Sequence, residues 1–139
     1  MKNISSIDYS EAQRAIALIV EKAEQMRKSV AVAVADPHGE LIAFARMDGV
    51  PLPSINIAIN KAFSAARARK PTQEIGDKVK DPEKGYDISY YGDPRFVGWG
   101  GGIPVLRDGN IVGAVAVSGL SAAEDATLAT LGVDIITGR

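Results

Sequence analysis

The chain alternates between stretches with helical spacing of apolar residues and shorter runs without polar side chains. Over residues 10–28, apolar residues recur every three or four positions, which is the spacing of one helix face. Ser10, followed three residues later by Gln13, fits a capping box, in which side chains satisfy free backbone N–H groups. We therefore expect a helix here that packs against a sheet. Its predicted inward face comprises Tyr9, Ala12, Ile16, Ile19, Val20, Ala23 and Met26.

Two later stretches show the same spacing. The first begins at Ser54, a candidate cap, and runs until a group of cations and a proline end it. The second covers residues 122–137, where Ser121 and Glu124 form another capping-box pattern. Both are predicted to be helices. The inward residues of the last one are predicted to be Ala126, Leu128, Ala129, Leu131 and Ile135.

The stretch from residue 96 to residue 120 is expected to hold the centre of the fold. A glycine-dense loop leads into the apolar run 103–106, and a second run, 111–117, has no polar side chain. Such a run suits a strand that is covered on both faces. The Asp108-Gly109 pair between the two runs is a strong hairpin signal, because a type I′ turn needs positive φ at its central residues.

A second hairpin is predicted over residues 29–35 and 40–46, closed by the type I turn pattern of Asp36-Pro37-His38-Gly39. Hairpins dominate the order of elements, so the fold class is predicted to be α+β, with an antiparallel sheet of about five strands and helices packed on it. The whole chain, residues 1–139, is expected to form a single domain.

A brief helix over residues 72–79, capped by Thr72, is expected to precede a long irregular loop. That loop, residues 80–95, contains two prolines, two glycines and three tyrosines. Long irregular segments inside compact domains are usually either functional or mobile.

Composition narrows the function classes. The chain has no cysteine, so it offers no disulfide framework or thiolate metal site. Its formal net charge is −1. Acidic and basic residues are interspersed, and nothing in them favours nucleic acid or an anionic membrane. The first residues lack the apolar core of a signal peptide, and no apolar run approaches a membrane span. We expect a soluble, cytoplasmic protein.

Several short motifs occur together in a fixed order: Arg46-Met47-Asp48-Gly49, Lys61-Ala62, Pro71-Thr72, Gly101-Gly102-Ile103-Pro104 and the run from Val112 to Gly119. In this combination, over almost the whole chain, the sequence resembles the GlcG/HbpS-type haem-binding family. The same module is the C-terminal domain of PduO-type corrinoid adenosyltransferases. The resemblance implies a profilin-like α/β sandwich assembled into homo-oligomers.

The resemblance implies function only in outline. Some members of the family bind haem, and others resemble enzymes that act on small unsaturated acids. Three functions remain open: a haem-binding protein, a catabolic-pathway enzyme acting on a small unsaturated carboxylate, and an oligomeric accessory protein without chemistry of its own. Haem binding is the leading hypothesis, with haem or a related flat acidic compound as the ligand.

A set of polar and aromatic residues is predicted to converge on a cleft at the strand ends. Arginine binds a carboxylate in a bidentate manner and lysine adds a point charge, so cations there suit an acidic ligand. Asp125 is a candidate acid or base, although ion pairing is the commoner role of such a carboxylate. The candidate catalytic residues are Asp125 and Arg46, and the candidate cofactor-binding residues are Lys61, Arg95, Trp99, Gly101, Gly102 and Ser118.

Other candidate ligands are weaker. His38 is the only histidine, and haem iron commonly takes one, but its place in a turn predicts a solvated side chain that is dispensable for binding. No paired-histidine spacing exists, so no protein-bound metal is expected. The glycines before residue 103 open a strand, whereas a phosphate-binding loop opens a helix. They are expected either to leave bare backbone for a flat ligand or to relieve packing against a neighbouring subunit.

Overall fold

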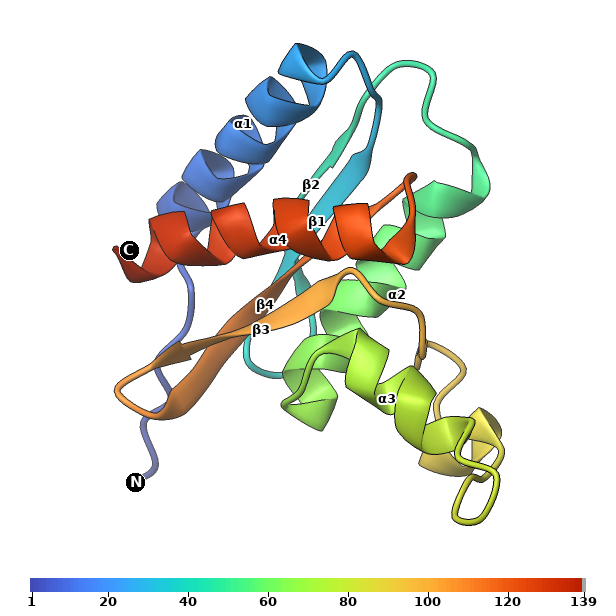
Figure 1. The fold of residues 1–139 in the computed structure, drawn as a ribbon. Coiled ribbons are helices and arrows are strands. Elements are labelled where there is room, and N and C mark those ends of the chain that lie inside the picture. Colours follow the sequence, from blue (N-terminus) through green and yellow to red (C-terminus); the bar gives the residue numbers. More distant parts are fainter. Residues whose placement is uncertain (139) are drawn as a thin grey trace.

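A four-stranded antiparallel sheet forms the middle layer of the protein in the computed structural model, which describes residues 1–138 (Figure 1). The strands lie in the order β2-β1-β4-β3, so β4 pairs with both β1 and β3 and is central, as predicted. Their bounds are β1 (Ala31–Ala35), β2 (Leu41–Arg46), β3 (Gly102–Arg107) and β4 (Asn110–Ser118). The helices are α1 (Tyr9–Gln25), α2 (Pro53–Ala68), α3 (Thr72–Val79), the 3-10 helix η1 (Ile88–Tyr91) and α4 (Ala122–Thr137).

The two faces of the sheet differ in side-chain size. Val32 and Val34 of β1 belong to the core under α1 and α4. The alternating residues Ala31, Ala33 and Ala35 lie under α2 instead. Because alanine side chains are short, α2 can approach this face closely, and its own alanines pack there. In Figure 1, α1 and α4 cover one face of the sheet and α2 lies behind it.

The sheet has four strands within residues 1–138, so the expectation of about five was wrong. The segment before β3 does not extend the sheet, because its backbone binds a side chain of α2. The Ser64 hydroxyl accepts a hydrogen bond from Val97 N (2.8 Å), and its own proton lies within reach of both Asn60 O (2.7 Å) and Arg95 O (3.2 Å). Gly98 then passes so close to Gly76 of α3 that a Cβ on Gly76 would overlap the Gly98 carbonyl oxygen.

The ends of the helices confirm one predicted cap and correct three. Ser121 and Glu124 form the predicted capping box of α4. The capping box of α1 uses Asp8 and Glu11 in place of Ser10 and Gln13, and Tyr9, at the first helical position, is exposed. A carboxylate is as good a cap as a hydroxyl, and Glu11 also binds Arg107 at 2.6 Å.

The remaining two predicted caps lie inside their helices. α2 begins at Pro53 without a side-chain cap, and proline suits this position because its missing N–H would have no helical partner. α3 follows Pro71, and the Thr72 hydroxyl accepts a hydrogen bond from Gly102 N (2.9 Å) instead of capping the helix. In α4, Ile136 is buried while Ile135 is exposed, which corrects the predicted inward face at that position.

Both predicted hairpin turns are present. Gly39 N donates to Asp36 O (2.9 Å) across the first turn. Asp108 and Gly109 both have positive φ, at 53° and 77°, as the second turn requires. Within residues 1–138, no helix is long and apolar enough to cross a membrane.

Candidate functional site

A buried ion pair joins the two layers of helices at one end of the sheet. Lys61 extends from α2 and Asp125 lies in the first turn of α4, on the other side of the sheet. The Lys61 Nζ lies 3.2 Å from Asp125 Oδ2 and donates to the Val117 carbonyl oxygen at 3.0 Å. Each side chain is only 2% exposed. The charges therefore meet in an environment that is nearly closed to solvent.

The second carboxylate oxygen of Asp125 is also held. Leu120 N, in the turn before α4, donates to Asp125 Oδ1 at 3.0 Å. Both oxygens are thus fixed by the backbone at the end of β4 and by Lys61. An ammonium group has three donors, and Val117 and Asp125 account for two of them.

Burial moves both groups toward their neutral forms. Desolvation lowers the pKa of Lys61, and the attraction of Asp125 only partly offsets this. Desolvation likewise raises the pKa of Asp125, against the pull of Lys61 and the hydrogen bond from Leu120. A low-dielectric site penalises both charges. Transfer of the proton between the two groups is therefore easier here than between surface groups.

Gly101 and Gly102 make room for Lys61. A Cβ on Gly101 would lie 2.7 Å from Lys61 Nζ, and a Cβ on Gly102 would lie 2.6 Å from the Lys61 carbonyl oxygen. Gly101 has a φ of 128°, which side chains rarely adopt. The space beside these two glycines is occupied by Lys61 and by atoms of Val117, Asp125 and Thr72, so neither glycine offers bare backbone to a ligand, and neither lines the pocket described next.

A pocket of about 260 Å³ opens next to the ion pair. We call it the Trp99 pocket. Its apolar rim comes from the connection before α2 and the start of α2, and its other side comes from the segment after β4 and the ion pair. It is lined by Pro51, Pro53, Ser54, Ile57, Lys61, Trp99, Ser118, Gly119, Leu120 and Asp125.

Trp99 forms a flat wall of this pocket. The indole is 61% exposed, although tryptophan is usually largely buried. Its ring centroid lies 5.9 Å from the Lys61 Nζ, within the range of a cation–π contact. A ligand in the pocket would therefore contact an aromatic face on one side and polar groups at the base.

The structure brings four of the predicted site residues together: Lys61, Trp99, Ser118 and Asp125. Arg46 does not line the pocket. It pairs with Ala31, which pairs with Ser118, so Arg46 lies two strands from Ser118, about 10 Å away at the usual strand spacing. Its side chain is exposed at the edge strand.

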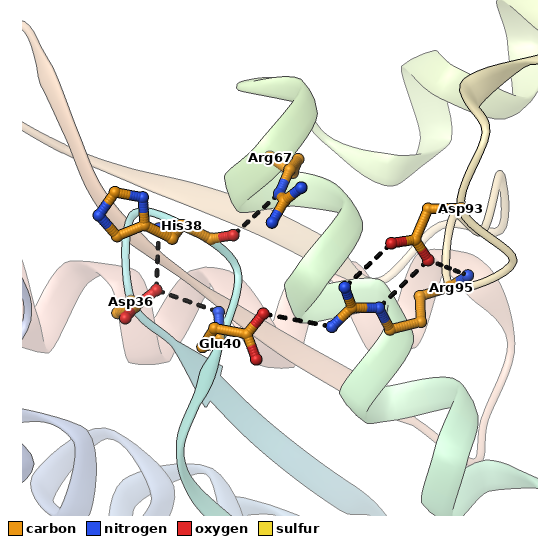
Figure 2. Close-up of polar contacts among 6 residues, drawn as sticks. All are labelled: Asp36, His38, Glu40, Arg67, Asp93 and Arg95. Carbon is orange, nitrogen blue, oxygen red and sulfur yellow. Dashed lines mark hydrogen bonds and ion pairs between the residues drawn. The ribbon is translucent and has the colours of Figure 1, made fainter.

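Arg95 belongs to a different polar network (Figure 2). Its guanidinium group binds both oxygens of Asp93, at 2.9 and 3.2 Å, and Glu40 at 3.3 Å. It also lies 3.9 Å from the centroid of the Phe63 ring. Arg95 lowers the pKa of Asp93 through these hydrogen bonds. This network fastens the loop that carries Trp99 to α2 and to the first hairpin, and it does not reach the pocket.

A second hollow, of about 450 Å³, lies at the opposite end of α2. We call it the basic hollow. It is bordered by the N-terminal segment, both hairpin turns and the end of α2. Its cations are Lys2, Arg67, Arg69 and Arg107, and His38 lies on its rim. The His38 side chain is exposed, as its place in the turn predicted. Arg67 donates to the His38 carbonyl oxygen at 3.0 Å, as Figure 2 shows.

Sequence reasoning missed the rim of the Trp99 pocket. Pro51, Pro53 and Ile57 line the pocket but are not among the predicted site residues. The signal that could have found them is the position of this proline-rich connection directly before the helix that carries Lys61. Within residues 1–138, no group of three or more His, Asp or Glu side chains is placed to hold a metal ion.

These features define a class of protein: an antiparallel sheet between helices, with a small pocket at the end of its central strand. The family model described as "Haem degrading protein HbpS-like" matches residues 7–134. The chain therefore belongs to the HbpS-like family, which confirms the resemblance found in the sequence.

Relatives and solved structures agree with this assignment. A 15.0 kDa protein of Citrobacter freundii, from the dhaT-dhaS intergenic region, is 32% identical over 96% of this chain and 94% of its own length. The crystal structure of the Klebsiella pneumoniae protein ORFY superposes with a TM-score of 0.93 at 29% identity, covering 100% of this chain and 96% of that one. The structure of a PduOC–haem complex superposes with a TM-score of 0.86 at 27% identity, covering 94% of each chain.

Proposed function

We propose that this chain is an oligomeric ligand-binding protein that takes haem, or a related flat acidic compound, at the Trp99 pocket. The observation that carries the proposal is the exposed indole of Trp99 beside a buried ammonium group. Membership of the HbpS-like family and the fold shared with a protein solved in complex with haem support the choice of haem.

The residues of the pocket fit the flat and acidic parts of such a ligand. An exposed indole offers an apolar face for a planar ring. The Lys61 ammonium and the Ser118 hydroxyl are donors for a carboxylate oxygen, and both line the pocket. Asp125 offsets the charge of Lys61, but its pKa is raised, so uptake of a proton by Asp125 would leave the ammonium group free for an acidic ligand.

The pocket does not fit the whole of a haem within one chain. Its volume of about 260 Å³ is below the ~300–1,000 Å³ of sites that enclose a small ligand. None of the described residues that line it is a histidine, tyrosine or methionine, the usual iron ligands. The pocket therefore suits the carboxylate-bearing edge and one ring face. When bound, haem would add the ligand-binding and redox chemistry of its iron.

A second subunit would cover the exposed part of the ligand. Leu52, which is 67% exposed, directly follows Pro51 on the pocket rim, and Trp99 is exposed next to it. We expect the protein to sediment as a closed homo-oligomer, because symmetric association is the usual way to bury such a surface. Sedimentation velocity at micromolar concentration measures this directly, and a clean monomer would contradict it.

Haem titration with two variants tests the site. We expect Trp99→Ala to weaken haem binding about 30-fold, the effect of losing an aromatic anchor of about 2 kcal/mol. His38→Ala should bind haem as the wild type does. Absorbance in the Soret region measures both affinities, with the oligomeric state held constant. The reverse result, loss in His38→Ala and none in Trp99→Ala, would place haem in the basic hollow and overturn the proposed site.

A further inference from the structure

Lys61 combines two properties that rarely occur together. Its side chain is buried, yet the residue lines a pocket that opens to solvent. Replacing a buried ion pair with apolar residues of similar size is often neutral or stabilising, so stability alone gives no reason to keep it. Burial of a lysine, in contrast, lowers its pKa and favours the neutral, nucleophilic amine, and a neighbouring carboxylate can then act as the proton carrier.

The neighbours of Lys61 place its amine for reaction. Asp125 Oδ2 lies 3.2 Å from Nζ, at the limit of the distance over which a side chain can move a proton directly. The Val117 carbonyl oxygen accepts a hydrogen bond from the amine, and Leu120 N donates one to the carboxylate. Because burial lowers the pKa of Lys61 and raises that of Asp125, a larger share of neutral amine is available than on the surface.

We propose that Lys61 is a nucleophile that condenses with the carbonyl group of a small aldehyde or 2-oxo acid in the Trp99 pocket, with Asp125 carrying the protons. This inference shares the location of the proposed ligand site but does not depend on haem. A volume of about 260 Å³ is that of eight or nine liquid waters at ~30 Å³ each, which suits a compound of a few carbons.

The reaction balances with the groups present. Lys61 passes one proton to Asp125, and its nitrogen lone pair then forms a bond to the carbonyl carbon while the C=O π electrons move to oxygen. A proton moves from nitrogen to that oxygen by way of Asp125 and gives a carbinolamine. Asp125 then protonates the hydroxyl group, the C–O bond breaks, and water leaves. The products are a protonated imine on Lys61, one water and the Asp125 carboxylate.

Reductive trapping tests this step. The wild-type protein is incubated at neutral pH with glycolaldehyde or glyoxylate and sodium cyanoborohydride, and peptide mapping by mass spectrometry locates the adducts over time. We expect Lys61 to be modified severalfold faster than Lys28, because burial lowers the pKa of Lys61 and leaves more neutral amine at neutral pH. Lys28 is the matched reference, since it also pairs with a carboxylate of α4 but is 43% exposed.

Two variants separate chemistry from structure. Lys61→Arg keeps the positive charge but forms no imine, so the fast adduct should disappear. Asp125→Asn keeps the amine but removes the proton carrier, and trapping should slow by about 10²-fold. Modification of Lys61 no faster than Lys28 in the wild-type protein would overturn the inference, and that comparison stands even if a variant fails to fold. Because no haem is present, the outcome is independent of the haem titration.

Discussion

Lys61→Met is expected to lower the free energy of unfolding by about 3–5 kcal/mol, the range found when one partner of a buried ion pair is removed. The substitution leaves the Asp125 carboxylate 2% exposed, with the hydrogen bond from Leu120 N still present but no cation beside it. Methionine has nearly the length of lysine and creates little cavity. Urea unfolding followed by circular dichroism measures the change.

Two further variants control for this result. Lys28→Ala removes the surface pair between Lys28 and Glu124, which also involves the first turn of α4, and should lose only about 0–1 kcal/mol. Lys61→Met combined with Asp125→Leu should recover most of the stability, because no charge remains buried. A loss in Lys61→Met no larger than in Lys28→Ala would contradict the description of the pair as buried.

The pH dependence of the free energy of unfolding should also reveal the buried Lys61–Asp125 pair. The folded protein loses the Lys61 proton at a lower pH than the unfolded chain, whose pKa is near 10.5, so stability should rise with pH through that window. The folded protein keeps the Asp125 proton above 3.8, where the unfolded chain has released it, so stability should fall as pH rises from there through the raised pKa. The double variant should lack both slopes.

Gly101→Ala is expected to lower the free energy of unfolding by about 2–6 kcal/mol. The φ of 128° strains any side chain by about 1–3 kcal/mol. The added Cβ would also lie 2.6 Å from the Val117 carbonyl oxygen and 2.7 Å from Lys61 Nζ. Crowding of this kind adds about 1–3 kcal/mol in packed regions. The same unfolding measurement applies.

Gly109→Ala separates the two contributions. Gly109 also has positive φ, at 77°, but its Cβ would meet nothing within 4 Å. Its loss should therefore reflect backbone strain alone, about 1–2 kcal/mol. Equal losses in the two variants would show that Gly101 does not hold space for the ion pair.

Local chemistry explains which parts of the fold could be predicted. The central place of β4 followed from its run of apolar residues, and the second hairpin followed from Asp108-Gly109. The cap of α4 followed from Ser121 and Glu124. The number of strands could not be predicted in this way, because the segment before β3 is held by Ser64, which is 33 residues away from Val97.

Half of the predicted site residues line the Trp99 pocket, and the geometry of the site could not be predicted. Ser118 was predicted at the end of the central strand, Lys61 in the helix after a strand and Asp125 in the closing helix, and the structure brings the three together. Lys61 and Asp125 are 64 residues apart and come from opposite faces of the sheet, so the sequence could not show that they pair with each other in a buried site. Arg95 was also predicted to bind the cofactor, but its guanidinium group is held by Asp93 and Glu40 (Figure 2).

A crystal structure of the protein in complex with haem measures the location of the ligand most directly. We predict density for the porphyrin against the Trp99 indole, with a propionate group directed toward Lys61 and Ser118 and a second subunit over the exposed face. Density for haem in the basic hollow, next to His38 and Arg67, with the Trp99 pocket empty, would contradict the proposed site.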